Sequence, residues 1–253
     1  MQADPSSLRR AIAVACAGAM AVAGAGHAAQ PPERAQARAA GQAQSAASPT
    51  FSRPTRIDNR WLPLSSIERS VLRGTKEGRR VRSVITPLER TKAFRIHGSP
   101  VRAMVVKDRA YENGKLHEVA LDYYAQADDG TVYYLGEDVD IYNRAGTRVV
   151  SHEGAFLYGR DTRTLGVAMP ARPRKGARFT FERVPGLGSE RNRVVSTTAR
   201  VSVPGGTFSP ALKIRSYHRP DAERELKWYA PGVGLLKEQG PTGGVELVSP
   251  ATR

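Results

Sequence analysis

Cysteine is almost absent from this sequence, because the 253 residues include only one, Cys16. It lies in the Ala-rich apolar run Ala11–Ala25, which we expect to be removed with a leader segment. A chain cleaved after Ala28 or Ala29 has no thiol. Disulfide bonds, thiolate nucleophiles and cysteine-ligated zinc sites are then excluded.

The sequence also lacks the motifs that identify common enzymes. It has no G-x-S-x-G nucleophile turn, no H-E-x-x-H zinc motif and no phosphate-binding loop of the G-x-x-x-x-G-K-[ST] type. Its five histidines lie singly along the chain. No residue can be named as a nucleophile on this basis, so the sequence favours a non-catalytic protein and leaves an enzyme as the alternative.

The N-terminal segment has the pattern of an export signal. Arg9 and Arg10 precede the apolar run, which is too short and too Ala-rich to span a membrane stably, and small residues follow it. We therefore predict a signal peptide over residues 1–29, a protein released into the periplasm or medium, and no transmembrane segment in the mature chain. Ala13–Cys16 loosely resembles a lipoprotein cleavage site, so lipid anchoring through Cys16 is the alternative.

Beyond the leader, the composition predicts a tether followed by one domain. Residues 30–50 are mostly Ala, Gln, Pro, Arg and Ser without periodicity, which is typical of a disordered tether. Residues 51–253 suit a single domain. The formal net charge of +15 favours an anionic envelope surface as a partner. Because the basic residues are scattered and form no basic helix, nucleic acid is not an expected partner.

Within that domain the apolar residues alternate with polar ones and show no helical period. About a dozen such runs are separated by pairs such as Glu77-Gly78, Asn113-Gly114 and Asp129-Gly130, which are turn signals. Consecutive hairpins predict an all-β antiparallel meander. A dozen strands are too many for a flat sheet, so we expect the meander to curl into a half-barrel, a barrel or a sandwich.

The segment from Leu116 to Asn143 stands out because it contains no Lys or Arg. It holds seven acidic residues and five of the nine tyrosines, in two alternating runs around Asp129-Gly130. This acidic, aromatic hairpin is the place where a ligand site is expected. Its candidate ligand-binding tyrosines are Tyr123, Tyr124, Tyr133 and Tyr134, which could stack on or hydrogen-bond an amphipathic ligand.

Two-residue hairpin loops predict the pairing of the charged residues. With two-residue loops at Asn113-Gly114 and Asp129-Gly130, Arg109 lies opposite Glu118 and Asp122 lies opposite Glu137. A four-residue loop over residues 143–146 then places Glu137 opposite His152. One face of the sheet then carries six candidate site residues: Lys107, Arg109, Glu118, Asp122, Glu137 and His152. The other face carries Met104, Val106, Val119, Leu121 and Tyr123 as core.

Facing carboxylates repel unless something compensates their charge. The predicted face is therefore open to three interpretations. It can be a solvated face of salt bridges, or a ligand-binding face with Lys107, Arg109 and Glu118 beside which tyrosines of the hairpin stack on or hydrogen-bond a ligand. It can also be a divalent metal site or acid–base pair formed by Asp122, Glu137 and His152.

Six segments, taken together, resemble a family of uncharacterised exported bacterial all-β proteins. They are Asn59–Leu64, Asp122–Gln126 (D-Y-Y-A-Q), Val132–Glu137 (V-Y-Y-L-G-E), Gly166–Pro170, Val203–Phe208 (V-P-G-G-T-F) and Trp228–Leu235 (W-Y-A-P-G-V-G-L). The resemblance covers most of residues 59–248 and implies a secreted protein or a lipoprotein, with no established activity. The last two segments are also similar to those of envelope proteins in which a curved antiparallel half-barrel holds acyl chains.

The sequence thus favours an exported, non-catalytic binding module for a lipid-like or amphipathic ligand. A metal-binding or hydrolytic protein that uses the Asp/Glu/His cluster is the first alternative. A purely structural or interaction protein is the second. The oligomeric state does not follow from the sequence.

Overall fold

The computed structural model describes residues 48–220 and 222–252. The predicted signal peptide, Cys16 and residues 30–47 of the predicted tether lie outside these residues. Within them, Thr50 and Ser52 are bonded to the turn at Asp128: the Asp128 amide donates to the Thr50 carbonyl at 2.9 Å, and the Ser52 amide donates to Asp128 Oδ1 at 2.8 Å. No helix in the described part of the chain has the length and hydropathy needed to cross a membrane.

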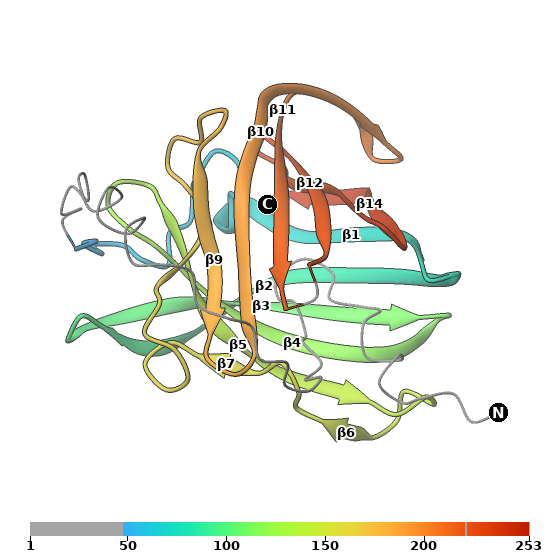
Figure 1. The fold of residues 1–253 in the computed structure, drawn as a ribbon, viewed down its shortest axis with the longest axis horizontal. Helices are drawn as coiled ribbons and strands as arrows, with labels where there is room; N and C mark the ends of the chain where they lie inside the picture. The colour runs from blue at the N-terminus through green and yellow to red at the C-terminus, as the bar shows by residue number, and fades with distance from the viewer. Residues whose placement is uncertain (1–47, 221, 253) are drawn as a thin grey trace, which may run out of the picture.

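Fourteen strands form one antiparallel sheet, which confirms the predicted all-β meander (Figure 1). The strands are β1 (Ile67–Lys76), β2 (Arg79–Ile96), β3 (Ser99–Glu112), β4 (Lys115–Gln126), β5 (Val132–Tyr142), β6 (Val149–Ser151), β7 (Phe156–Leu157), β8 (Gly166–Met169), β9 (Arg178–Val184), β10 (Gly188–Val203), β11 (Gly206–Arg219), β12 (Arg224–Ala230), β13 (Gly234–Gly240) and β14 (Gly243–Thr252). In residues 48–220 and 222–252 the one helical segment is the 3-10 turn η3 (Leu64–Ser66).

The chain builds the sheet from two runs of hairpins. Strands β1 to β6 pair in sequence order, and so do β9 to β14. The runs are joined because β14 pairs with β1, with Leu72 opposite Leu247. The resulting order is β6-β5-β4-β3-β2-β1-β14-β13-β12-β11-β10-β9, and the sheet is curled but not closed.

Two successive residues with left-handed backbone conformation form the turn of each tight hairpin. Lys76 pairs with Arg79 around Glu77-Gly78, whose φ angles are 49° and 74°. Asn113 and Gly114 have φ angles of 49° and 86°, so the predicted two-residue turn between β3 and β4 is confirmed. Positive φ at both positions is the requirement of a type I′ turn, whose twist matches that of the flanking strands.

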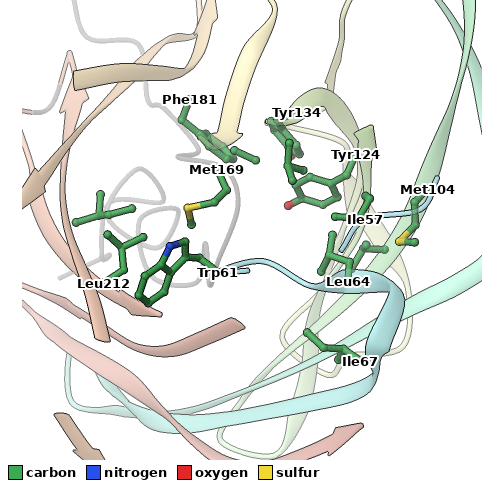
Figure 2. Close-up of a cluster of buried hydrophobic side chains, with 14 of the residues drawn as sticks. Ile57, Trp61, Leu64, Ile67, Met104, Tyr124, Tyr134, Met169, Phe181 and Leu212 are labelled. Atoms are coloured by element: carbon green, nitrogen blue, oxygen red, sulfur yellow. The ribbon is translucent and has the colours of Figure 1, made fainter. Parts of the chain in front are cut away.

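The curl brings the two runs of hairpins face to face. In Figure 1, β1–β4 run across the view and β9–β12 run roughly upright, so the two halves cross at a steep angle. Side chains of both halves meet between them in the largest apolar cluster, part of which Figure 2 shows: Met104 and Tyr134 from one half contact the cluster that holds Phe181 and Leu212 from the other. We call the face toward this interior the inner face of the sheet.

Strand β8 lies between β5 and β9, the region in which the two halves of the curled sheet approach each other. It pairs with β5, and Gly166 approaches β9 so closely that a Cβ there would lie 1.9 Å from the Phe181 carbonyl oxygen. Glycine is therefore required at this position by close backbone approach, since no side chain fits. Thr162 supports the same seam because its Oγ1 donates to the Arg183 carbonyl at 2.6 Å.

Candidate functional site

The four tyrosines of the central hairpin do not gather in one place. Tyr124 and Tyr134 point to the inner face, where their ring centroids are 5.2 Å apart. Tyr123 and Tyr133 belong to the apolar cluster on the outer face, and Tyr123 lies 5.6 Å from Phe94. Because neighbouring side chains of a strand alternate between faces, the predicted group of tyrosines is divided between the two sides of the sheet.

The predicted face of β3 is wrong. Lys107 is half-buried and Arg109 is exposed on the outer face, whereas Asp108, between them, is buried on the inner face. Met104 and Val106, expected on the opposite side from Asp122, share the inner face with it instead.

A β-bulge accounts for this difference. Beyond the Asn113-Gly114 turn, Tyr111 pairs with Leu116, but Ala110 pairs with Glu118, so His117 is the extra residue. A bulge shifts the register by one, and one residue of shift exchanges the faces of every later side chain. Arg109 therefore lies opposite Val119 rather than Glu118.

Asp122 lies opposite Glu137, as predicted, although the turn between their strands differs from the predicted one. Gln126 pairs with Val132, so the loop has five residues rather than two. A second bulge, between the Tyr124 and Asp122 pairs, contains Gly136 with φ 104°. The two deviations cancel, and both carboxyl side chains come to the inner face with 3% exposure each.

His152 does not join these carboxyl groups, so its predicted place opposite Glu137 is wrong. Phe156 is the residue that pairs with Glu137. The His152 Nδ1 lies 2.8 Å from the Val139 carbonyl and 3.0 Å from Asp140 Oδ1, and 71% of the His152 side chain is exposed. In residues 48–220 and 222–252, no group of three His, Cys, Asp or Glu side chains is arranged to hold a metal ion.

Acidic side chains nevertheless gather on the inner face. We call this group the carboxyl cluster; it comprises Asp108, Glu118, Asp122, Glu137 and Glu182. The Ser83 hydroxyl donates to Asp108 at 2.6 Å, and the Tyr134 hydroxyl donates to Asp122 at 2.8 Å. The Oε1 atom of Glu137 is buried and has no hydrogen-bond partner within the described residues.

Burial governs how these groups ionise. It raises the pKa of Asp108 to about 7, and burial together with the charges of Asp108 and Asp122 raises the pKa of Glu118 to about 8. Burial also raises the pKa of Asp122 and of Glu137, and the neighbouring carboxyl groups raise both further. The cluster therefore holds protons at neutral pH, which relieves the repulsion between facing carboxylates.

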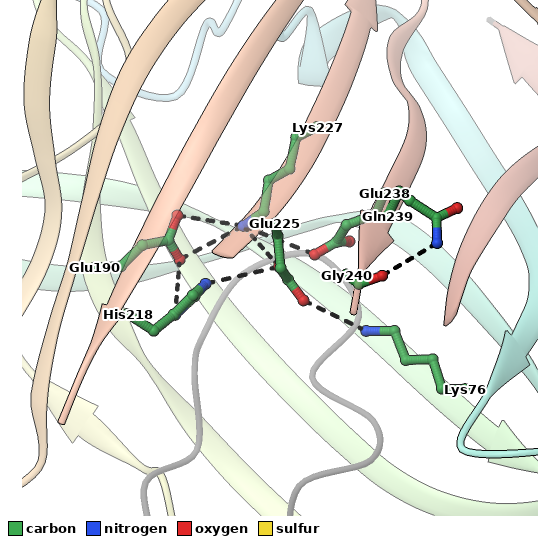
Figure 3. A network of polar contacts seen from close by, with 8 residues as sticks. All are labelled: Lys76, Glu190, His218, Glu225, Lys227, Glu238, Gln239 and Gly240. Atoms are coloured by element: carbon green, nitrogen blue, oxygen red, sulfur yellow. Dashed lines mark hydrogen bonds and ion pairs between the residues drawn. The ribbon is translucent and has the colours of Figure 1, made fainter. Parts of the chain in front are cut away.

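A second polar group on the inner face surrounds Lys227 of β12 (Figure 3). Its Nζ lies 3.2 Å from Glu190, 3.8 Å from Glu238 and 3.9 Å from Glu225. Burial disfavours the charged amine, but the three carboxylates prevail and raise the pKa of Lys227 well above its usual value. His218 lies 3.9 Å from Glu190 and 3.7 Å from Glu225, so it belongs to the same network.

The space between the two polar groups is small. A cavity of about 60 Å³ is lined by Asp108, Asp122, Glu190 and Lys227 among apolar side chains. One water requires roughly 10–15 Å³ of such volume, so the cavity suits a few waters. Ligand pockets commonly measure about 300–1,000 Å³, and an acyl chain therefore has no room in this interior as it stands.

A much larger hollow lies at the end of the sheet where the β9–β10 turn and the β11–β12 loop meet, near the lower ends of β9 and β11 in Figure 1. Its volume is about 1120 Å³, and we call it the end groove. Phe179, Val184 and Leu187 supply apolar surface. Five arginines line it as well: Arg178, Arg191, Arg193, Arg219 and Arg224.

Our sequence interpretation missed both the Lys227 network and the end groove. Glu190 and Asn192 alternate with Arg191 and Arg193, a period of two that separates two polar faces rather than an apolar and a polar one. This alternation could have indicated that the groove arginines share one exposed face of β10. Nothing local in the sequence marks Lys227 as buried, because its burial depends on carboxylates from β10 and β13.

No family model and no curated protein matches the chain. One solved structure that shows similarity is a "putative lipoprotein" from Parabacteroides distasonis ATCC 8503. It is 10% identical, the alignment covers 75% of this chain and 97% of that chain, and the TM-score is 0.38. A likeness at this level supports no conclusion about fold or function.

Proposed function

We propose that this protein is an exported, non-catalytic binding module that holds an anionic amphipathic ligand in the end groove. The single observation that carries the proposal is the groove itself, about 1120 Å³ of hollow in which five arginines surround apolar side chains. Export is supported by the basic, apolar and small-residue pattern of residues 1–29.

The chemistry of the groove selects the ligand class. Arginine guanidinium groups favour carboxylate or phosphate oxygens, which they can bind in bidentate fashion. Phe179, Val184 and Leu187 offer an apolar surface to a hydrocarbon portion of the same molecule. An anionic lipid with its head against Arg219 and its chain against Leu187 satisfies both requirements.

A role in hydrolysis has less support. Asp122 and Glu137 form a facing carboxyl pair, but each is 3% exposed, and the adjoining cavity of about 60 Å³ leaves no room for a substrate. The structure also separates His152 from the pair. A metal or acid–base site would therefore need both a further ligand and an opening of the sheet.

Calorimetric titration with dihexanoyl phosphatidylglycerol, kept below its critical micelle concentration, tests the proposal. We expect saturable binding, and much weaker binding of the zwitterionic dihexanoyl phosphatidylcholine. Leu187→Ser should weaken affinity about tenfold, because a buried apolar contact is lost. Arg219→Ala should weaken it by a similar factor through loss of a charge-assisted hydrogen bond.

Arg95→Ala serves as the matched control, because Arg95 is exposed on the β2–β3 hairpin and does not line the groove. Absence of binding would reject the proposal. Binding that Leu187→Ser and Arg219→Ala leave unchanged would also reject it, since the ligand would then lie elsewhere.

A further inference from the structure

The outer face of β9–β12 carries arginines in direct cross-strand register. Arg178 of β9 pairs with Arg193 of β10, and Arg193 pairs with Arg215 of β11. All three point outward, because their neighbours Phe179, Val194 and Ile214 pack in the inner core. Like charges directly opposite one another destabilise a sheet, so this row is unfavourable for folding alone.

The second row places the ring of Tyr217 between two arginines. Arg191 lies opposite Tyr217, and Tyr217 lies opposite Arg224. A hydrogen bond from Arg215 lowers the pKa of the Tyr217 hydroxyl against the opposing effect of burial, and the charges of Arg215, Arg224 and Arg193 lower it further. The potential at this face is therefore strongly positive.

The third row centres on Trp228. The Lys213 Nζ lies 4.8 Å from the centre of the Trp228 ring, and the Lys237 Nζ lies 5.8 Å from it. Lys237 forms an ion pair with Glu246 at 2.5 Å, whereas none of the ion pairs in the described part of the chain involves Lys213. We call the outward side chains of these three rows the basic face; its cations are Arg178, Arg191, Arg193, Lys213, Arg215 and Arg224.

The ion pairs in residues 48–220 and 222–252 are formed by basic side chains outside the basic face, such as Lys76, Arg79 and Lys92. The positive charge of the basic face is therefore available to bind a partner. A matching partner carries negative charge over an area as wide as several strands. Adjacent strands lie about 4.8 Å apart, so the rows present closely spaced charges.

We propose that the basic face docks the protein on an anionic phospholipid surface. Cationic side chains are drawn to the negative potential of such a surface, and Trp and Tyr favour the interface between hydrocarbon and water. Tyr217 and Trp228 lie half-buried among these cations, and Trp228 also packs against the apolar cluster of Leu236. The inference rests on the exported location in the proposed function, and it adds the membrane from which the groove takes its ligand.

Arg178, Arg191, Arg193 and Arg224 line the end groove as well, so vesicle binding tests the docking surface through Trp228 and through the two cations outside the groove, Lys213 and Arg215. We expect the full protein to co-sediment with phosphatidylcholine vesicles that contain phosphatidylglycerol, but not with pure phosphatidylcholine vesicles, and to dissociate as salt is raised. The chain has two tryptophans, and Trp61 is buried. Binding should therefore shift the emission of Trp228 to the blue, and Trp228→Phe should abolish that shift.

Lys213 and Arg215 separate the two sites because neither lines the end groove. Each basic side chain near a lipid surface contributes about fivefold to partitioning, so the double variant Lys213→Ala/Arg215→Ala should partition about 25-fold less. It should still bind monomeric dihexanoyl phosphatidylglycerol like the native protein. The matched control is Arg95→Ala/Arg102→Ala, which removes two exposed charges from the β2–β3 hairpin.

Three results would overturn the inference. One is no binding to anionic vesicles at physiological ionic strength. The second is an equal loss of binding in the control variant, which would show a response to net charge alone. The third is tighter binding to duplex DNA than to vesicles, which would assign the face to a nucleic acid. Loss of monomeric lipid binding with vesicle binding intact would instead reject the groove proposal and leave this one standing.

Discussion

Asp122 and Glu137 lie directly opposite each other on β4 and β5, and each side chain is buried on the inner face of the sheet. Two ionised carboxylates in this position would repel each other strongly, because a buried site screens charge poorly. Protonation relieves the repulsion. Burial and the neighbouring carboxyl groups accordingly raise the pKa values of both residues. Burial thus favours the protonated form of these carboxyl groups, and His152 lies apart from them.

The carboxyl cluster should make stability fall as pH rises. The folded pKa is about 7 for Asp108 and about 8 for Glu118, whereas carboxyl groups of an unfolded chain titrate near pH 4. The folded protein thus binds more protons, so this stabilisation is complete below about pH 4 and is lost as pH rises through about 7 to 8. Urea unfolding at a series of pH values from about 5 to 9 should show a falling free energy.

The opposite trend, or no trend, would show that the cluster is ionised in the folded protein. Burial raises the pKa of Glu238 to about 8, and, against burial, the Glu225 hydrogen bond and the Glu190 charge raise the pKa of His218, so both add to the falling trend. Glu225 does not contribute to it. Burial opposes its ionisation, but the His218 hydrogen bond and the charges of Lys227 and Lys76 lower its pKa, so it stays ionised throughout that window.

Glu137→Gln should reduce this pH dependence. The amide cannot ionise, so one proton fewer is released as the folded protein is made alkaline. We expect the variant to be no less stable than the native protein at about pH 9, where Glu137 is otherwise forced toward its charged form. Parallel unfolding curves measure the effect, with Glu68→Gln as control, since Glu68 is exposed on β1. An equal slope in native protein and Glu137→Gln would contradict the account.

Lys227→Met should destabilise the fold by about 3–5 kcal/mol, because removal of one partner leaves the buried charge of the others uncompensated. Glu190, Glu225 and Glu238 are the groups affected. Lys115→Met, at an exposed position of β4, should change stability by less than about 0.5 kcal/mol. Urea denaturation provides both values.

A double variant separates charge from packing at Lys227. Lys227→Met/Glu190→Gln should recover part of the loss, since the carboxylate nearest to the amine is then neutral. If the double variant is as unstable as the sum of the single ones, the network has no energetic coupling and our interpretation of it is wrong.

Gly166→Ala should weaken the seam between β8 and β9. A methyl group at this position would lie 1.9 Å from the Phe181 carbonyl oxygen, so backbone must move. We expect a loss above about 2 kcal/mol and faster amide exchange in β8 and β9. Gly176→Ala is the control, because it has open space and should show only the penalty of its positive φ, about 1–2 kcal/mol. Equal losses in the two variants would argue against a close seam.

The individual hairpins could be predicted from the sequence, because the two strands and the turn of a hairpin are adjacent in the chain. The alternation of β3 and β4 and the Asn113-Gly114 pair defined one such unit, and the structure confirms it. His97-Gly98 forms an equivalent turn between β2 and β3, but the dipeptide carries a weaker turn signal. The pairing of β1 with β14 joins segments about 180 residues apart, and no local pattern contains that information.

The candidate site was less predictable, since it depended on register. A bulge at His117 exchanged the faces of Lys107 and Arg109, while a longer turn and a bulge at Gly136 cancelled and left Asp122 opposite Glu137. Bulges arise from tertiary packing, such as the approach of Gly136 to the Phe156 carbonyl, which an ungapped hairpin cannot anticipate. The inner carboxyl pair was therefore placed correctly through two compensating differences.

Mapping of ligand-induced NMR shifts tests most directly where this protein binds its ligand. Titration of the isotope-labelled protein with monomeric dihexanoyl phosphatidylglycerol should perturb the amides of the β9–β10 turn around Leu187 and of the β11–β12 loop around Arg219. Amides around Tyr124 and Tyr134 should stay unchanged. Perturbation centred on those inner tyrosines, or no perturbation at saturating lipid, would contradict the end groove as the binding site.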